Sequence, residues 1–166
     1  TTADSYRITT GVAMTESRSI EADEETEAQS HLLTYWASLV DEDALPRRGA
    51  FDPGAVLPYL GGITILELTE TGQLVCRVES SIKVLLSAQE LLEVRRLGLD
   101  TLLQNQSPVQ GHRPTSCGIH HWLRLPLLSD GGDRLVILCY DEFVMDRNSG
   151  GRYSGSNVTL SSNYDA

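Results

Sequence analysis

The sequence predicts an α+β fold in which an antiparallel sheet carries helices on one face and follows an amphipathic N-terminal helix. Two pairs of strand-like segments, at 63–79 and 119–144, flank a helical segment at 81–103. Strands that alternate apolar and polar residues between glycine-rich turns are typical of an antiparallel sheet.

The first strand pair follows a short capped helix. Asp52 can accept hydrogen bonds from the first free helical amides, and the glycines at 61–62 end the helix. The segments 63–68 and 73–79 are then expected to pair across a tight turn at 70–72.

An amphipathic helix is predicted before this hairpin. An acidic run at 21–27 favours the positive end of the helix dipole, and we interpret it as a solvated helix start, with docking of a partner as the alternative. Trp36 is expected in the core, or else as an anchor at a dimer interface. Apolar residues at helical spacing form one stripe, which is the candidate dimer interface: Leu32, Leu33, Trp36, Leu39 and Val40.

The middle of the chain is predicted to be helical and then irregular. Gly98 is expected to break the helical segment, and Asp100 to cap a second short helix. The stretch 107–118 contains proline and glycine, and it is interpreted as a loop that holds His112 and Arg113.

The last third is predicted to form two long strands, 119–125 and 135–144, joined by a turn at 129–133. An inward-facing Asp141 would need a partner, such as Arg124 or Arg77. The simpler interpretation is that the second strand leaves the core at this point.

Length and charge limit the domain organisation and the function. With 166 residues, the chain is expected to form a flexible arm (1–20), one domain (21–147) and a disordered tail (148–166). A net charge of -10 argues against nucleic acid and against an anionic membrane surface as partners. Three scattered cysteines and no charged-then-apolar leader favour reduced thiols in a cytoplasmic protein.

An ordered set of residues between about 31 and 145 resembles a group of bacterial single-domain PAS-like proteins. In that group a Trp-bearing helix precedes a P-x-R-x-x-F-D-P segment, a strand with an arginine follows, and L-x-L-P-L comes near the end. The matching residues here are Trp36, Pro46, Arg48, Phe51, Asp52, Pro53, Arg77, Leu123, Leu125, Pro126 and Leu127, before the turn Asp130-Gly131. The resemblance implies a PAS-like fold and a sensory or protein-interaction role without catalysis.

Candidate chemistry is sparse in the sequence. His120 and His121 would point to opposite faces of a strand, so the pair is not expected to chelate one metal ion. Cys76 lies mid-strand, unlike the helical cysteine of flavin-binding photosensors, so no flavin chemistry is expected and no cofactor is required. Residues expected to face the helices and line any cavity are Leu74, Cys76, Val78, Ile119, His121 and Leu123.

Two functional hypotheses follow. The first is a non-catalytic module that signals by forming a homodimer or by binding a protein partner, with a small-molecule ligand as a further option. The second is a small-molecule enzyme in which His121 or His112 acts as the base.

Overall fold

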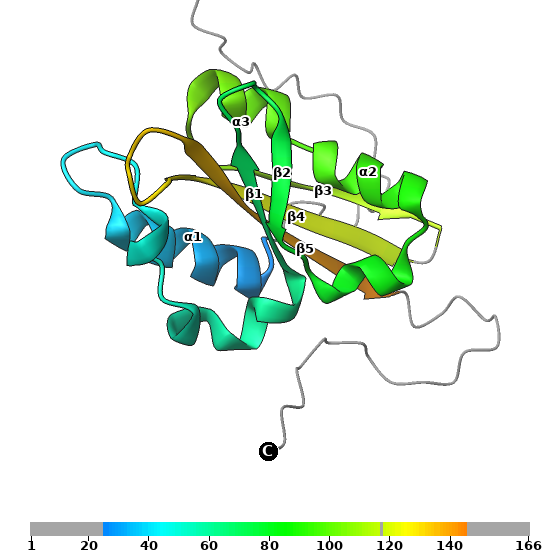
Figure 1. The fold of residues 1–166 in the computed structure, drawn as a ribbon. Coiled ribbons are helices and arrows are strands. Elements are labelled where there is room, and N and C mark those ends of the chain that lie inside the picture. The colour runs from blue at the N-terminus through cyan, green and yellow to red at the C-terminus, as the bar shows by residue number, and fades with distance from the viewer. Residues whose placement is uncertain (1–24, 117, 146–166) are drawn as a thin grey trace, which may run out of the picture.

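The computed structural model describes residues 25–116 and 118–145, so the predicted arm, the predicted tail and Cys117 lie outside the described residues. A five-stranded antiparallel sheet has the order β2-β1-β5-β4-β3 (Figure 1). Its strands are β1 (Ile63–Leu68), β2 (Leu74–Val78), β3 (Val109–Thr115), β4 (Gly118–Leu128) and β5 (Leu135–Met145). The helices are α1 (Glu27–Leu39), α2 (Ala88–Arg96) and α3 (Leu99–Asn105), with short 3-10 helices η1 (Arg48–Ala50), η2 (Pro53–Gly62) and η3 (Ser81–Leu85).

The predicted α+β fold and its four strands are confirmed, but the predicted loop at 107–118 is wrong. That stretch forms β3, an edge strand that pairs along its whole length with β4. An edge strand tolerates Pro114 because one side of its backbone needs no partner in the sheet. Gly111 is required by packing, since a Cβ atom there would lie 2.6 Å from the Trp122 ring. Proline and glycine therefore mark an edge strand here and not a loop.

Helix α1 is anchored to the sheet at its first turn. Thr26 and Gln29 form a capping box, in which each side chain bonds the other residue's backbone amide. The Gln29 side chain is also buried, and its Nε2 donates to the Gly111 carbonyl at 3.3 Å and to the Trp122 carbonyl at 3.0 Å. One residue therefore both starts α1 and fixes it over β3 and β4.

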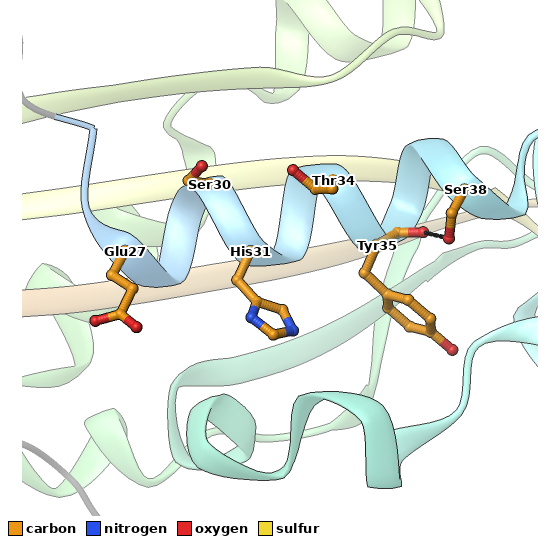
Figure 2. Close-up of a pocket in the computed structure, with 6 residues that line it drawn as sticks. All are labelled: Glu27, Ser30, His31, Thr34, Tyr35 and Ser38. Atoms are coloured by element: carbon orange, nitrogen blue, oxygen red, sulfur yellow. Dashed lines mark hydrogen bonds between the residues drawn. The ribbon is translucent and has the colours of Figure 1, made fainter.

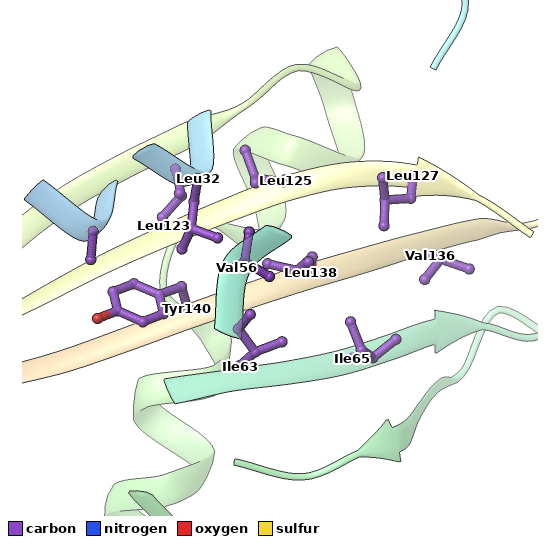
Figure 3. Close-up of a cluster of buried hydrophobic side chains, with 11 residues drawn as sticks. Leu32, Val56, Ile63, Ile65, Leu123, Leu125, Leu127, Val136, Leu138 and Tyr140 are labelled. Atoms are coloured by element: carbon purple, nitrogen blue, oxygen red, sulfur yellow. The ribbon is translucent and has the colours of Figure 1, made fainter. Parts of the chain in front are cut away.

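The face of the sheet beneath α1, here called the α1 face, holds the larger apolar core (Figure 3). Leu32 of α1 is fully buried in it, and Trp36 donates its ring N–H to the Pro126 carbonyl at 2.8 Å. The core consists of Ala28, Leu32, Val56, Ile63, Ile65, Leu123, Leu125, Leu127, Val136, Leu138 and Tyr140. Helix η2 contributes Val56 and so packs on the same face as α1.

The opposite face, here called the α2–α3 face, carries a second cluster. Alternation along β5 turns Ile137 and Cys139 to this side, where they pack with Leu99 and Leu102 of α3. Gly98, between α2 and α3, has φ +72°, and a Cβ atom there would lie 2.5 Å from the Trp122 ring. The predicted break at Gly98 is thus confirmed. Asp100 is not the cap that was expected, because Gly98 occupies the cap position.

The segment that joins α1 to the sheet is pinned to the β4–β5 turn. Arg47 donates to the Asp130 carbonyl at 2.6 Å, and the Gly49 amide donates to Asp130 Oδ1 at 2.7 Å. Farther along, Asp52 accepts from the Gly54 amide at 2.8 Å, which confirms its predicted capping role. The P-x-R-x-x-F-D-P segment and the acidic-glycine turn are therefore neighbours in space.

Candidate functional site

The six residues predicted to line one cavity do not meet. Cys76 lies on the edge strand β2, opposite Leu66 of the α2–α3 face, whereas Leu123 of β4 lies opposite Tyr140 of the α1 face. Two strands, β1 and β5, separate β2 from β4. The prediction of a shared cavity is wrong. Both strands alternate apolar and polar residues, but this does not place the apolar residues of the two strands on the same face of the sheet.

A register shift further divides the residues of β2. The shift falls between Ile65 and Leu66, so Val78 lies opposite Ile65 while Cys76 lies opposite Leu66. Leu74 and Val78 are exposed by 37% and 43%. A bulge of this kind interrupts simple alternation. The expectation that Leu74, Cys76 and Val78 share one face and point at the helices is therefore wrong.

His121 lies on the α1 face with Ile119 and Leu123, and it is only half-buried. Its ring is 5.9 Å from that of His112 on β3, centroid to centroid. Burial lowers the pKa of His121 below its ordinary value, although Glu142, directly opposite on β5, acts to raise it. Within the described residues, no group of three or more His, Cys, Asp or Glu side chains could hold a metal ion.

A buried polar network that the alternation argument missed lies on the α2–α3 face. His120 Nε2 and Asp141 Oδ1 are 2.9 Å apart, and Arg124 donates to the same oxygen at 3.0 Å. His120 and Arg124 have no exposed surface, and Asp141 is 4% exposed. The interpretation that β5 leaves the core at Asp141 is wrong, and Arg124 is the partner that an inward Asp141 requires.

Arg124 uses every N–H of its guanidinium. It has five donors, and each has an acceptor within 3.1 Å: the carbonyls of Val94, Leu97, Leu123 and Tyr140, and the Asp141 carboxylate. Two of these carbonyls, those of Val94 and Leu97, belong to the end of α2, where helical carbonyls lack i→i+4 partners; the Val94 carbonyl also accepts from the Leu97 amide at 3.3 Å. Arg124 therefore ties the C-terminal end of α2 to the centre of the sheet.

The hydrogen bonds also define the state of the His120 ring. Arg113 of β3 donates its Nε–H to His120 Nδ1 at 3.3 Å, and a guanidinium can only donate. Nδ1 must then carry a lone pair, so the proton lies on Nε2 and is donated to Asp141. The ring also stacks on Phe143, with centroids 4.4 Å apart. Arg113, His120, Asp141 and Arg124 thus form one continuous chain from the β3 edge to α2.

The electrostatics of this interior favour a charged Arg124 and a neutral thiol nearby. Burial acts to lower the pKa of Arg124, but the charge and hydrogen bond of Asp141, together with a contribution from Cys139, outweigh burial, and the pKa is raised. Burial raises the pKa of Cys139 to about 12, with Asp141 adding to the effect and Arg124 opposing it. The guanidinium stays protonated and the thiol stays neutral at physiological pH.

A second feature is a shallow depression of about 510 Å³ along the outer side of α1 (Figure 2). Next to it, His31 packs edge-on against Tyr59 of η2 at 5.3 Å, and Tyr35 Oη accepts from the Asp52 amide at 2.9 Å. Its described lining residues all come from α1: Glu27, Ser30, His31, Thr34, Tyr35 and Ser38. The outer side of α1 is thus mainly hydroxyl-bearing and uncovered by the described part of the chain.

The candidate dimer residues lie on the inner and flanking sides of α1. Leu32 is fully buried, and Leu33 and Trp36 pack against the core of their own domain. Leu39 and Val40, at the end of the helix, are half-buried. Leu32 and Trp36 therefore belong to the core of their own domain and are not free to form a contact between copies.

The family-model comparison matches a PAS domain over residues 24–107, just over half of the chain. The chain belongs to the PAS domain family. The match ends before β3, but β3, β4 and β5 complete the same antiparallel sheet as β1 and β2. No curated protein and no solved structure matches this PAS domain. In the described part of the chain, no helix has the length and apolar character needed to cross a membrane.

Family membership indicates a sensory or interaction module. PAS domains are typically non-catalytic modules of this kind. Two features of this PAS domain bear on how it could act: the buried Arg124 network that fixes α2, and the uncovered outer side of α1.

Proposed function

We propose that this PAS domain is a non-catalytic module that signals by association, and that the outer side of α1 is the surface on which a second copy packs. The observation that carries the proposal is the depression along α1, which no described segment covers. The inner side of the same helix is already used by the domain core.

The chemistry of the outer side supports packing of helix on helix. Ser30, Thr34 and Ser38 follow one another at a spacing of four residues, so they form one line along the helix. Short side chains of this kind allow two helix backbones to approach closely. Thr34 lies at the centre of the line, so a two-fold axis that passes near Thr34 at right angles to the helix would pair the helices antiparallel.

The charge at both ends of α1 sets the salt dependence of such a dimer. Glu25 and Glu27 lie at the start of the helix, and an acidic stretch at 41–43 follows its end. In an antiparallel pair each acidic end meets the acidic end of the other copy. Moderate salt screens this repulsion and should strengthen association.

The interior supports a role without catalysis. The buried acid and base, Asp141 and His120, are both engaged in hydrogen bonds that hold β3, β4 and α2 together. His121 and His112, the bases of the enzyme hypothesis, lie instead on the α1 face, His112 on the edge strand β3 and His121 on the neighbouring strand β4.

Native mass spectrometry of the full chain, with an absorbance spectrum, tests the proposal. We expect a dimer mass at tens of micromolar protein in ammonium acetate of moderate ionic strength. If the protein is instead a monomer with a bound small molecule, the proposal of signalling by association would be wrong, and ligand sensing would take its place. Turnover of a small-molecule substrate that is lost in His121→Gln or His112→Gln would favour the enzyme hypothesis.

A further inference from the structure

Two histidines face each other across strands β3 and β4, on the α1 face of the sheet. His112 and His121 are register partners in this antiparallel pair, and the centroids of their rings lie 5.9 Å apart. His112 is exposed and His121 is half-buried, so solvent reaches both rings. Neither ring forms a hydrogen bond to any residue that the structure describes. A neutral imidazole keeps one nitrogen lone pair, so this histidine pair offers two unused lone pairs to a ligand.

The backbone fixes the spacing of the histidine pair. In an antiparallel sheet, the Cβ atoms of residues directly opposite each other lie about 4.5–5.5 Å apart, and their side chains share a face. Gln29 of α1 donates to the carbonyls of Gly111 and Trp122, which are the chain neighbours of the two histidines. The two imidazoles are therefore anchored side by side before a ligand arrives, so binding orders little additional chain.

The charge around the histidine pair favours a cation. Glu142 lies directly opposite His121 on β5, and it accepts from Tyr140 Oη at 3.3 Å. The nearest residues on this side of β3 and β4 are uncharged: Gln110, Pro114, Ile119 and Leu123. Among the described strand residues that adjoin the pair on this face, Glu142 alone carries a formal charge. A carboxylate at this position attracts a positive ion and repels an anion.

We propose that His112 and His121 bind one divalent transition-metal ion of the class that prefers imidazole ligands, such as Zn²⁺, Ni²⁺ or Cu²⁺. The protein supplies two ligands and water supplies the rest, because no group of three or more His, Cys, Asp or Glu among the described residues could hold the ion. Glu142 offsets part of the ion's charge from β5. The bound ion ties the edge strand β3 to β4 and keeps exchangeable positions for a further ligand. This inference does not depend on association through the outer side of α1.

Isothermal titration calorimetry with Zn²⁺, in a buffer that does not bind metal ions, tests the inference on the full chain without a polyhistidine tag. His112→Gln and His121→Gln each remove one proposed ligand at an accessible position, so the fold should persist, which circular dichroism checks. His31→Gln, on the outer side of α1, is the matched control for a histidine outside the pair. Cys76→Ser is the control for the exposed thiol, a group that also binds Zn²⁺.

We expect one Zn²⁺ per chain. Loss of either ligand should weaken binding by at least about tenfold, because loss of a residue that only orients a metal ligand already weakens it by about 10–100-fold. Both controls should bind as the wild type does. Zn²⁺ should also raise the melting temperature of the wild type but not of His112→Gln, because an ion that binds only the folded chain stabilises it. No binding at millimolar Zn²⁺, unchanged binding in either ligand variant, or an equal loss in either control would overturn the inference.

Discussion

Replacement of Arg124 by methionine should remove a large fraction of the stability of the domain. Methionine keeps a similar length but offers no donor, so Asp141 loses its buried cation, and the carbonyls of Val94 and Leu97 each lose the hydrogen bond from Arg124. Breaking a buried ion pair from one side costs about 3–5 kcal/mol. A domain of this kind has a free energy of unfolding of about 5–15 kcal/mol, so the loss is a large fraction of the total.

Urea denaturation followed by circular dichroism measures this loss, and two further variants identify its cause. Arg96→Met, on the exposed side of α2, should lie within about 0.5 kcal/mol of wild type. The double variant Arg124→Met/Asp141→Leu removes both charges and should recover part of the stability, because an apolar pair carries no unpaired buried charge. Hydrogen exchange should also show faster opening of α2 in Arg124→Met. A loss below about 1 kcal/mol, or no recovery in the double variant, would refute the description of Arg124 as the tie between α2 and the sheet.

Three further predictions follow from the same contacts. Gly118→Ala should destabilise the domain by several kcal/mol in urea denaturation, because the added Cβ would lie 1.9 Å from the Val144 carbonyl oxygen; Gly72→Ala, with open space but φ +78°, should cost only about 1 kcal/mol. Burial lowers the pKa of His121, so the unfolded chain binds more protons and stability should fall as pH drops below 6.5; His121→Gln should flatten that slope, and an unchanged slope would contradict the assignment. Cys76 is exposed while the pKa of Cys139 is raised to about 12 by burial, so iodoacetamide at pH 8 followed by peptide mass mapping should label Cys76 well before Cys139, and equal labelling would contradict their placement.

The parts of the fold that the sequence predicts are those set by local chemistry. The β1–β2 hairpin depends on Gly72, whose φ of +78° suits the turn, and the start of η2 depends on the Asp52 cap. The break between α2 and α3 depends on Gly98. Each of these signals acts within a few residues, so it can be recognised in the sequence without knowledge of the fold.

The parts that the sequence does not predict depend on contacts between distant segments. Arg124 and Asp141 lie at the polar positions of strands in which apolar and polar residues alternate. From alternation alone, both side chains would be expected to face solvent. Helix α2 covers that face, and the carbonyls of Val94 and Leu97 become acceptors only after the helix is in place. One argument from the sequence did point to this contact: if Asp141 faced inward it would need a positively charged partner, and Arg124 was one of the two candidates.

The candidate cavity failed for a related reason. Alternation shows which residues of one strand share a face of the sheet. Whether residues of two strands share a face, and whether they are neighbours, depends on strand order and on bulges. The bulge opposite Ile65 reverses the side of Val78, and the order β2-β1-β5-β4-β3 separates Cys76 from His121 by two strands. Neither feature leaves a local mark in the sequence.

Sedimentation velocity of the full chain tests the proposed association most directly. Wild type should sediment as a dimer at tens of micromolar and should associate slightly more tightly in moderate salt than in low salt. Thr34→Arg places a charged side chain at the centre of the outer side of α1 and should give a monomer, whereas Thr101→Arg, the same change on the exposed side of α3, should remain dimeric. A wild type that stays monomeric in both salts, or equal behaviour of the two variants, would contradict association through α1.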